Sequence, residues 1–162
     1  MFSTSARAEA DTRDEGPLPF AAMPAADLQP PKGARVIDVG GGRVWRVDGV
    51  VFEVIDCPSI ELSDIRGFEE AVIELTGGAP GLILADIRKI RWASAEARAY
   101  AAGDSMREIV AAHALLVGSP VTRMIGSFFV RVSSPPFPVR LFTASDEATT
   151  WLRGRAAAAT AS

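Results

Sequence analysis

Hydrophobic and polar residues change their spacing along the chain, and these changes predict the order of the elements. Two apolar, β-branched runs, Val44 to Val47 and Val50 to Ile55, flank Asp48-Gly49. Because Asp-Gly accepts the positive φ angles of a tight turn, these runs predict a β-hairpin. A short edge strand is expected just before them, from Arg35 to Asp38, and Gly40 to Gly42 ends it.

After the hairpin the chain alternates between helical and strand patterns. Apolar residues between 65 and 75 recur at helical spacing, with Ser63 as the predicted N-cap and Gly77 as the stop. The continuous apolar run from Gly81 to Asp86 predicts a strand that is buried on both faces. Ser94 is then predicted to cap a helix that starts at Ala95.

The C-terminal part continues this alternation. A strand is expected from His113 to Val117, and Ser119-Pro120 predicts the start of a helix. The apolar stripe of that helix is predicted to be Val121, Ile125, Phe128 and Val132. Val139 to Phe142 predicts a last short strand, and Ser145 is expected to cap a final helix that frays from Gly154.

This order predicts an α/β fold. An N-terminal β-hairpin is followed by alternating helices and parallel strands in one mixed sheet, with right-handed crossovers. Residues 34–155 are predicted to form one domain. Residues 1–33 are predicted to be a disordered arm because they are rich in proline and poor in apolar residues, and residues 156–162 a frayed tail.

Composition excludes several classes of function. The chain has 162 residues and a net charge of -3, which gives no general attraction to nucleic acid or to an anionic membrane. No apolar run approaches the ~20 residues that span a bilayer, and no signal peptide is recognisable. One cysteine, Cys57, fits a reducing compartment, so a cytoplasmic location is expected.

Few residues suggest cofactor or catalytic chemistry. Val36 to Gly42 resembles the glycine-rich loop of nucleotide-binding and S-adenosylmethionine-binding folds, but that loop requires a following helix, and here a hairpin follows. The single histidine, His113, is interpreted as structural rather than as a metal ligand. No nucleophile–base pair is recognisable. We therefore predict no metal, no cofactor and no enzymatic activity.

One end of the sheet carries the candidate contact residues. Ligands collect beyond the carboxyl ends of strands in open α/β sheets, and Asp86, Ser94, Gly118 and Ser119 are expected near that edge. The alternative is that Asp86 starts a turn while both serines cap helices, which we favour for Ser119. Another candidate contact is Phe128-Phe129, although packing against the loop at residues 135–137 is equally compatible.

A basic cluster follows the strand that ends at Asp86. It consists of Arg88, Lys89 and Arg91. Such a cluster can hold an anion or an acidic partner, or it can be a solvated loop.

The element order and several short stretches resemble a known family. Asp86-Ile87-Arg88-Lys89, followed by Ile90 and Trp92, resembles a motif of the STAS domain of bacterial anti-sigma-factor antagonists, over roughly Val44 to Leu152. Three further stretches resemble an uncharacterised bacterial branch of STAS-like proteins: Leu115 to Pro120, Arg123 to Phe129 and Arg140 to Thr143.

This resemblance implies a non-enzymatic module that binds a partner kinase or regulator, with phosphorylation at the start of the second helix as the switch. Ala95 occupies the position of the phosphoacceptor serine, so Ser94 is the nearest hydroxyl. The implied contact or phosphoacceptor residues are Asp86, Arg88, Arg91, Trp92 and Ser94.

Two further hypotheses concern other kinds of partner. The resemblance also allows a small-molecule or lipid carrier, which requires an apolar pocket lined by residues such as Phe128, Phe129 and Trp151. An edge strand near Arg35 or Val44 offers a route to a homodimer through sheet extension.

Overall fold

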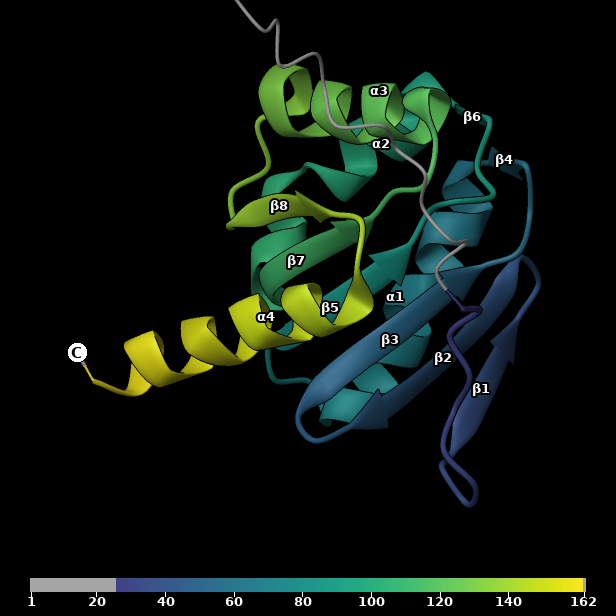
Figure 1. Cartoon of the computed structure of the whole chain (residues 1–162). Coiled ribbons are helices and arrows are strands. Elements are labelled where there is room, and N and C mark those ends of the chain that lie inside the picture. The colour runs from purple at the N-terminus through teal and green to yellow at the C-terminus, as the bar shows by residue number, and fades with distance from the viewer. Residues whose placement is uncertain (1–25, 162) are drawn as a thin grey trace, which may run out of the picture.

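The computed structural model describes residues 26–161, and a six-stranded sheet forms its centre (Figure 1). The strands, in their order across the sheet, are β1 (Val36–Val39), β2 (Gly42–Val47), β3 (Val50–Ile55), β5 (Gly81–Asp86), β7 (Val110–Leu116) and β8 (Val139–Phe142). The first three strands are antiparallel, and β3, β5, β7 and β8 are parallel. The predicted mixed sheet is therefore confirmed.

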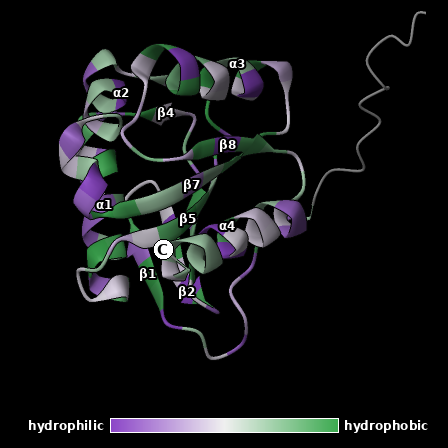
Figure 2. Cartoon of the chain, turned by 90° about the vertical axis from the view of Figure 1, so that its left-hand side faces the viewer, coloured by the Kyte–Doolittle hydropathy of each residue, from purple (hydrophilic) through white to green (hydrophobic). Residues whose placement is uncertain are grey.

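Helices cover both faces of this sheet. They are α1 (Leu62–Thr76), α2 (Ala95–Ala101), the 3-10 helix η1 (Asp104–Glu108), α3 (Pro120–Phe128), the π-helical turn η2 (Phe129–Ser133) and α4 (Ser145–Thr160). Two short strands, β4 (Ser59–Ile60) and β6 (Trp92–Ala93), form a separate parallel pair. In Figure 2, α1 and α2 lie on one side of the sheet, α4 lies on the other, and α3 lies above β8.

The glycine-rich motif serves the turn between β1 and β2. A Cβ atom on Gly42 would lie 2.0 Å from the carbonyl oxygen of Val54, so only glycine allows β2 to approach β3 this closely. The next turn uses Asp48 and Gly49, whose φ angles are 49° and 81°, as expected for the Asp-Gly hairpin. Strand pairing therefore explains Gly42, and the hairpin turn explains Gly49.

Several predicted boundaries differ from the structure, among them those of α1, β7 and α4. Helix α1 begins at Leu62, before Ser63, because the Asp64 carboxylate accepts a hydrogen bond from the Glu61 backbone N–H at 2.8 Å. Strand β7 begins at Val110, three residues before His113. Helix α4 contains Ser145 as its first residue and runs through the expected frayed segment to Thr160, because the alanine-rich sequence favours helix.

Most of the predicted apolar stripe of α3 does not face the core. Val121, Phe128 and Val132 are exposed, and only Ile125 packs against the core. The residues that α3 buries fully are Thr122 and Gly126. A Cβ atom on Gly126 would lie 2.6 Å from Leu141, so small side chains let α3 approach β8 and place its larger apolar residues outside.

The ends of the described region refine two expectations. Leu28, within the segment predicted as a disordered arm, packs on the core between the sheet and α4. Residues 1–25 of that arm and residue 162 lie outside the described residues. Of the two positions expected at a sheet edge, Arg35 directly precedes the edge strand β1, whereas Val44 lies on β2 between β1 and β3.

Candidate ligand cavity and interaction surface

Asp86 and Arg88 form a closed ion pair at the carboxyl end of β5. The Arg88 Nε atom donates to one oxygen of Asp86 at 2.8 Å, and its terminal nitrogen donates to the other at 2.7 Å. The Arg88 backbone N–H also donates to Asp86, at 3.1 Å. Asp86 is buried. This bidentate ion pair fixes the conformation of the loop after β5, so both side chains have a structural role.

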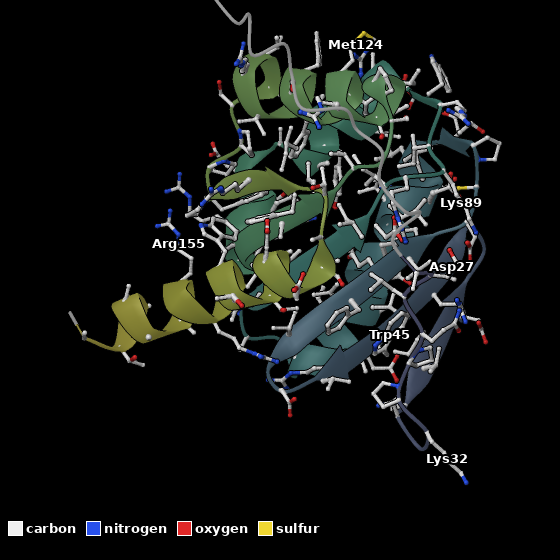
Figure 3. All side chains as sticks on the ribbon, viewed as in Figure 1. Asp27, Lys32, Trp45, Lys89, Met124 and Arg155 are labelled. Atoms are coloured by element: carbon white, nitrogen blue, oxygen red, sulfur yellow. The ribbon has the colours of Figure 1, made fainter. Side chains whose placement is uncertain are left out.

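Acidic side chains neutralise most of the positive charge of the basic cluster next to this ion pair. Lys89 donates to Asp56 at 2.6 Å, and this hydrogen bond raises the pKa of Lys89. Arg43 lies 4.0 Å from the same carboxylate. These groups line a polar cleft of about 260 Å³, and Figure 3 shows two of its lining residues, Asp27 and Lys89. The pairing leaves little uncompensated charge for an anion.

Ser94 and Trp92 occupy very different environments. Ser94 is the N-cap of α2: its hydroxyl oxygen accepts the Ala97 N–H at 3.1 Å, and the residue is 7% exposed. Trp92, on β6, is 53% exposed, and Arg91 is exposed beside it. The predicted edge therefore presents Arg91 and Trp92 outward, while the Ser94 hydroxyl is engaged in the cap.

The loops after β5 and β7 meet at Gly118. A Cβ atom there would lie 3.1 Å from the Arg88 side chain, so the structure brings these two predicted edge residues together. Ser119 caps α3 as favoured above: its hydroxyl accepts the Thr122 N–H at 3.2 Å, and the Thr122 hydroxyl accepts the Ser119 N–H at 3.0 Å. These hydroxyl groups are used in local structure.

Four apolar side chains project from the outward side of α3 and its π-helical turn. We call this surface the α3 patch, formed by Val121, Met124, Phe128 and Val132. Met124 and Val132 are 64% and 63% exposed, and Figure 3 shows Met124 pointing away from the molecule. Within residues 26–161, the other large apolar side chains exposed to this degree are Ile73 and Trp92. The sequence analysis named Phe128 as a candidate contact residue, but it did not identify Met124 as one.

The opposite side of α3 closes an apolar cavity of about 130 Å³. Its floor is one face of the sheet, formed by alternate residues of β3, β5 and β7, and its roof is formed by α1, α2, η1 and α3. Nearly all of the lining is apolar. The polar and charged side chains among the lining residues are Glu53, Glu69, Arg98 and His113.

The Glu53 carboxyl group and the ring nitrogens of His113 are buried without a hydrogen-bond partner in the described residues. Both ring nitrogens of His113 are inaccessible and make no hydrogen bond. Within the described residues we find no hydrogen bond or ion pair to the Glu53 carboxyl group. Burial lowers the pKa of His113 to about 4 and raises the pKa of Glu53 to about 7. At pH 7 the imidazole is therefore neutral and the carboxyl group is poised between its two states.

Glu69 and Arg98 lie toward the helices that cover the cavity. The Tyr100 hydroxyl donates to Glu69 at 2.6 Å. The Arg98 guanidinium lies over the Phe128 ring at 4.9 Å, and its Nε atom is inaccessible and makes no hydrogen bond. Arg98 thus connects the cavity lining with the α3 patch.

Sequence reasoning found only part of this cavity. Of the three aromatic residues expected in a carrier pocket, only Phe129 lines it. Phe128 lies in the α3 patch, and Trp151 packs on Phe142 at 5.6 Å on the opposite face of the sheet. Glu53 and Arg98 were missed. A glutamate in the otherwise apolar run from Val50 to Ile55 was the available signal for Glu53.

Other kinds of site have little support in the described residues. No group of three or more metal-ligating side chains occurs within residues 26–161. None of the helices in that region is long and apolar enough to cross a membrane.

The order and direction of the elements are those predicted from the sequence, an antiparallel hairpin region followed by alternating helices and parallel strands. The chain belongs to the family described as "Domain of unknown function (DUF7793)", whose model matches residues 44–155. The comparison with curated protein sequences gives no match.

Two solved structures are similar to the chain. One is an uncharacterised protein of the DUF3478 family with a SpoIIAA-like fold from Shewanella loihica PV-4, with a TM-score of 0.47 and 14% identity, covering 74% of this chain and 91% of that one. The other is an anti-sigma factor antagonist from Mycobacterium paratuberculosis, with a TM-score of 0.49 and 16% identity, covering 78% of this chain and 99% of that one.

Proposed function

We propose that the chain is a non-enzymatic regulatory module that binds a partner protein through the α3 patch. The observation that carries this proposal is the concentration of exposed apolar side chains on one short helix and its π-helical turn. Contiguous exposed apolar surface on a small domain is typical of an interaction site. The residues are spaced along one side of the helix, as an interface with another element requires.

The charge around the patch indicates the chemistry of the partner. The sequence contains no acidic residue between Ile109 and Ser145, whereas Arg131 lies on the π-helical turn that carries Val132. Arg98 adds a further positive charge beside Phe128. An acidic, amphipathic segment of a regulator or kinase is complementary to this surface, both in its charge and in its apolar side chains.

The proposal is tested by comparing two exposed apolar positions. Met124→Glu places a negative charge in the α3 patch, and Ile73→Glu places the same charge on α1, where Ile73 is 40% exposed. Captures from native extracts, quantified by mass spectrometry, are expected to lose the specific partner at least about tenfold with Met124→Glu only. Equal capture by both variants, both folded by circular dichroism, would reject the patch as the interface.

Phosphorylation at Ser94 is a separate part of this hypothesis. A phosphate at the N-terminus of α2 is electrostatically favoured, but the hydroxyl must first leave its cap to Ala97. A switch requires Ser94→Ala and Ser94→Glu to differ in partner binding. Equal binding by both variants would remove Ser94 from the account.

A second candidate function, binding of a small molecule, is favoured by the cavity beneath α3. Its apolar lining includes Glu53, whose buried carboxyl group has no hydrogen-bond partner in the described part of the chain. An unpaired buried polar group costs roughly 1–3 kcal/mol, so a native protein seldom retains one without a reason. A ligand that supplies the missing hydrogen bonds is such a reason.

A further inference from the structure

The volume and the lining of the cavity beneath α3 limit its ligand to a small, mostly apolar molecule. The cavity measures about 130 Å³, and apolar protein cavities of roughly 150 Å³ hold benzene. Among the described residues its lining is apolar apart from the side chains of Glu53, Glu69, Arg98 and His113. A ligand of about the size of benzene therefore fits, and a polar group on that ligand has to meet one of these side chains.

The Glu53 carboxyl group is a reachable, unpaired group in this lining. In the described residues, the side-chain polar atoms that are inaccessible and make no hydrogen bond are Arg98 Nε and both ring nitrogens of His113. A ligand cannot reach those atoms. The Glu53 oxygens are not among them, although they make no hydrogen bond within these residues either, so a small probe reaches them. Glu69, the other acid of the lining, already accepts a hydrogen bond from a tyrosine hydroxyl group.

The surroundings of Glu53 leave space beside its carboxyl group and do not balance its charge. Ala85, its register partner on β5, presents a small side chain to the same cavity. The Arg98 guanidinium lies over the Phe128 ring, at 4.9 Å, and makes no ion pair with Glu53. Burial raises the pKa of Glu53 to about 7, with no contribution from a neighbouring charge. Both protonation states of the carboxyl group therefore occur near neutral pH.

An amine is the ligand group that suits this carboxyl group in either protonation state. Between the pKa values of the two groups, a carboxyl group and an amine hold one proton between them, so the pair is neutral overall whichever atom holds it. In both arrangements one group donates a hydrogen bond to the other. A hydroxyl ligand leaves the charge of the carboxylate unbalanced, and an anionic ligand adds a second negative charge. Both are costly in apolar surroundings.

We propose that the cavity beneath α3 binds a small amine with a compact apolar body, and that the amine pairs with the carboxyl group of Glu53. The proposal rests on the small-molecule-binding function advanced above and names its ligand class. The other titratable or charged groups that line the cavity are Glu69 on α1, Arg98 on α2 and His113 on β7, and the lining residues from the remaining described elements are apolar.

Three compounds of about the size of benzene, with different polar groups, test the ligand class: cyclopentylamine, cyclopentanol and methylcyclopentane. Binding to the full chain is measured by NMR titration of residues in the cavity lining. Cyclopentylamine is expected to bind at least about tenfold more tightly than methylcyclopentane, because it adds a charge-assisted hydrogen bond, and also more tightly than cyclopentanol. Saturable shifts confined to the cavity lining would identify the site.

The affinity for cyclopentylamine is also expected to depend on pH. The bound pair holds one proton, whereas the free ammonium ion and the protonated carboxyl group hold two, so binding at low pH releases a proton. The affinity should therefore fall about tenfold or more between about pH 7.5 and about pH 5.5, as Glu53 becomes protonated. The pKa of His113 is lowered to about 4, so this imidazole stays neutral over that range. Binding of methylcyclopentane should not change.

Two matched variants show whether Glu53 is the partner of the amine. Glu53→Gln keeps the shape of the side chain and is expected to abolish both the preference for the amine and its pH dependence, while methylcyclopentane still binds. Glu69→Gln makes the same change at the other acidic residue of the lining and is expected to leave both unchanged. The pH dependence of the wild-type protein tests the pairing independently if Glu53→Gln does not fold.

The outcomes separate the ligand class from the binding function. Equal or tighter binding of methylcyclopentane or cyclopentanol would overturn the proposed class while leaving a functional cavity. Loss of the preference in Glu69→Gln rather than in Glu53→Gln, or binding of the amine that does not change with pH, would overturn the assignment to Glu53. If none of the three compounds binds, both the ligand class and the small-molecule-binding function are rejected, and the α3 patch proposal is unaffected.

Discussion

The two faces of the sheet are built from alternate residues of the same strands, yet they are packed differently. On β7, Ala114 and Leu116 are fully buried against α4. Leu115 and His113, the intervening residues, face the cavity beneath the other helices. The strands alone thus do not determine how tightly a face is packed, because the covering helices decide how much space is filled.

The largest effect is expected from one substitution made on each face. Leu116→Ala is expected to lower the free energy of unfolding by about 4 kcal/mol, because it opens a void in a filled region. Leu115→Ala is expected to cost only about 2 kcal/mol, since Leu115 already borders empty space and loses fewer contacts. Urea denaturation measures both, and equal losses would show that the two faces are packed alike.

The next comparison uses pH, because the cavity face buries two ionisable groups with opposite shifts. The pKa of Glu53 is raised from 4.5 to about 7, so its contribution to stability is present below pH 4.5 and lost as pH rises through about 7. The pKa of His113 is lowered from 6.5 to about 4, so its contribution is present above pH 6.5 and lost as pH falls through about 4. In wild type these slopes oppose each other.

Single variants are expected to reveal each slope. Glu53→Gln retains only the pH-dependent contribution of His113 to stability. Between pH 6.5 and 4.5 this variant should therefore lose stability relative to wild type on acidification. His113→Phe retains only the contribution of Glu53, so it should gain stability relative to wild type on acidification. Each change is on the order of 3 kcal/mol, at 1.36 kcal/mol per pKa unit. Glu69 and Arg98 line the same cavity and are unchanged in both variants. Parallel stability–pH curves for all three proteins would contradict the burial of these groups.

Features encoded by neighbouring residues were predictable from the sequence. Asp48-Gly49 between two β-branched runs predicted the hairpin, and Ser119-Pro120 predicted the start of α3. Ser94 was expected to cap α2 and does so. In each case the deciding hydrogen bond or φ angle lies within a few residues of the signal, so no knowledge of the tertiary structure is needed.

Features decided by distant residues were not predictable in the same way. The buried side of α3 depends on the approach of Gly126 to Leu141, which a count of apolar residues misses. Alternation along β3 places Glu53 on the same face as Val51 and Ile55, so its burial was readable. Glu53 lacks a hydrogen-bond partner because of the side chains that α1 and α2 place over it. No pattern of neighbouring residues in the sequence predicts which side chains these are.

The smallest expected effect comes from adding volume to each face, and its sign is expected to differ between the two faces. Ala85→Val, which projects into the cavity, is expected to raise the free energy of unfolding by about 1 kcal/mol by filling empty space. Ala114→Val, in the filled region against α4, is expected to lower it by about 1–2 kcal/mol through overpacking. Because both changes add the same atoms to a central strand, β-propensity is matched. Destabilisation by Ala85→Val as large as that by Ala114→Val, measured by urea denaturation, would mean that the cavity face has no space to accept a ligand.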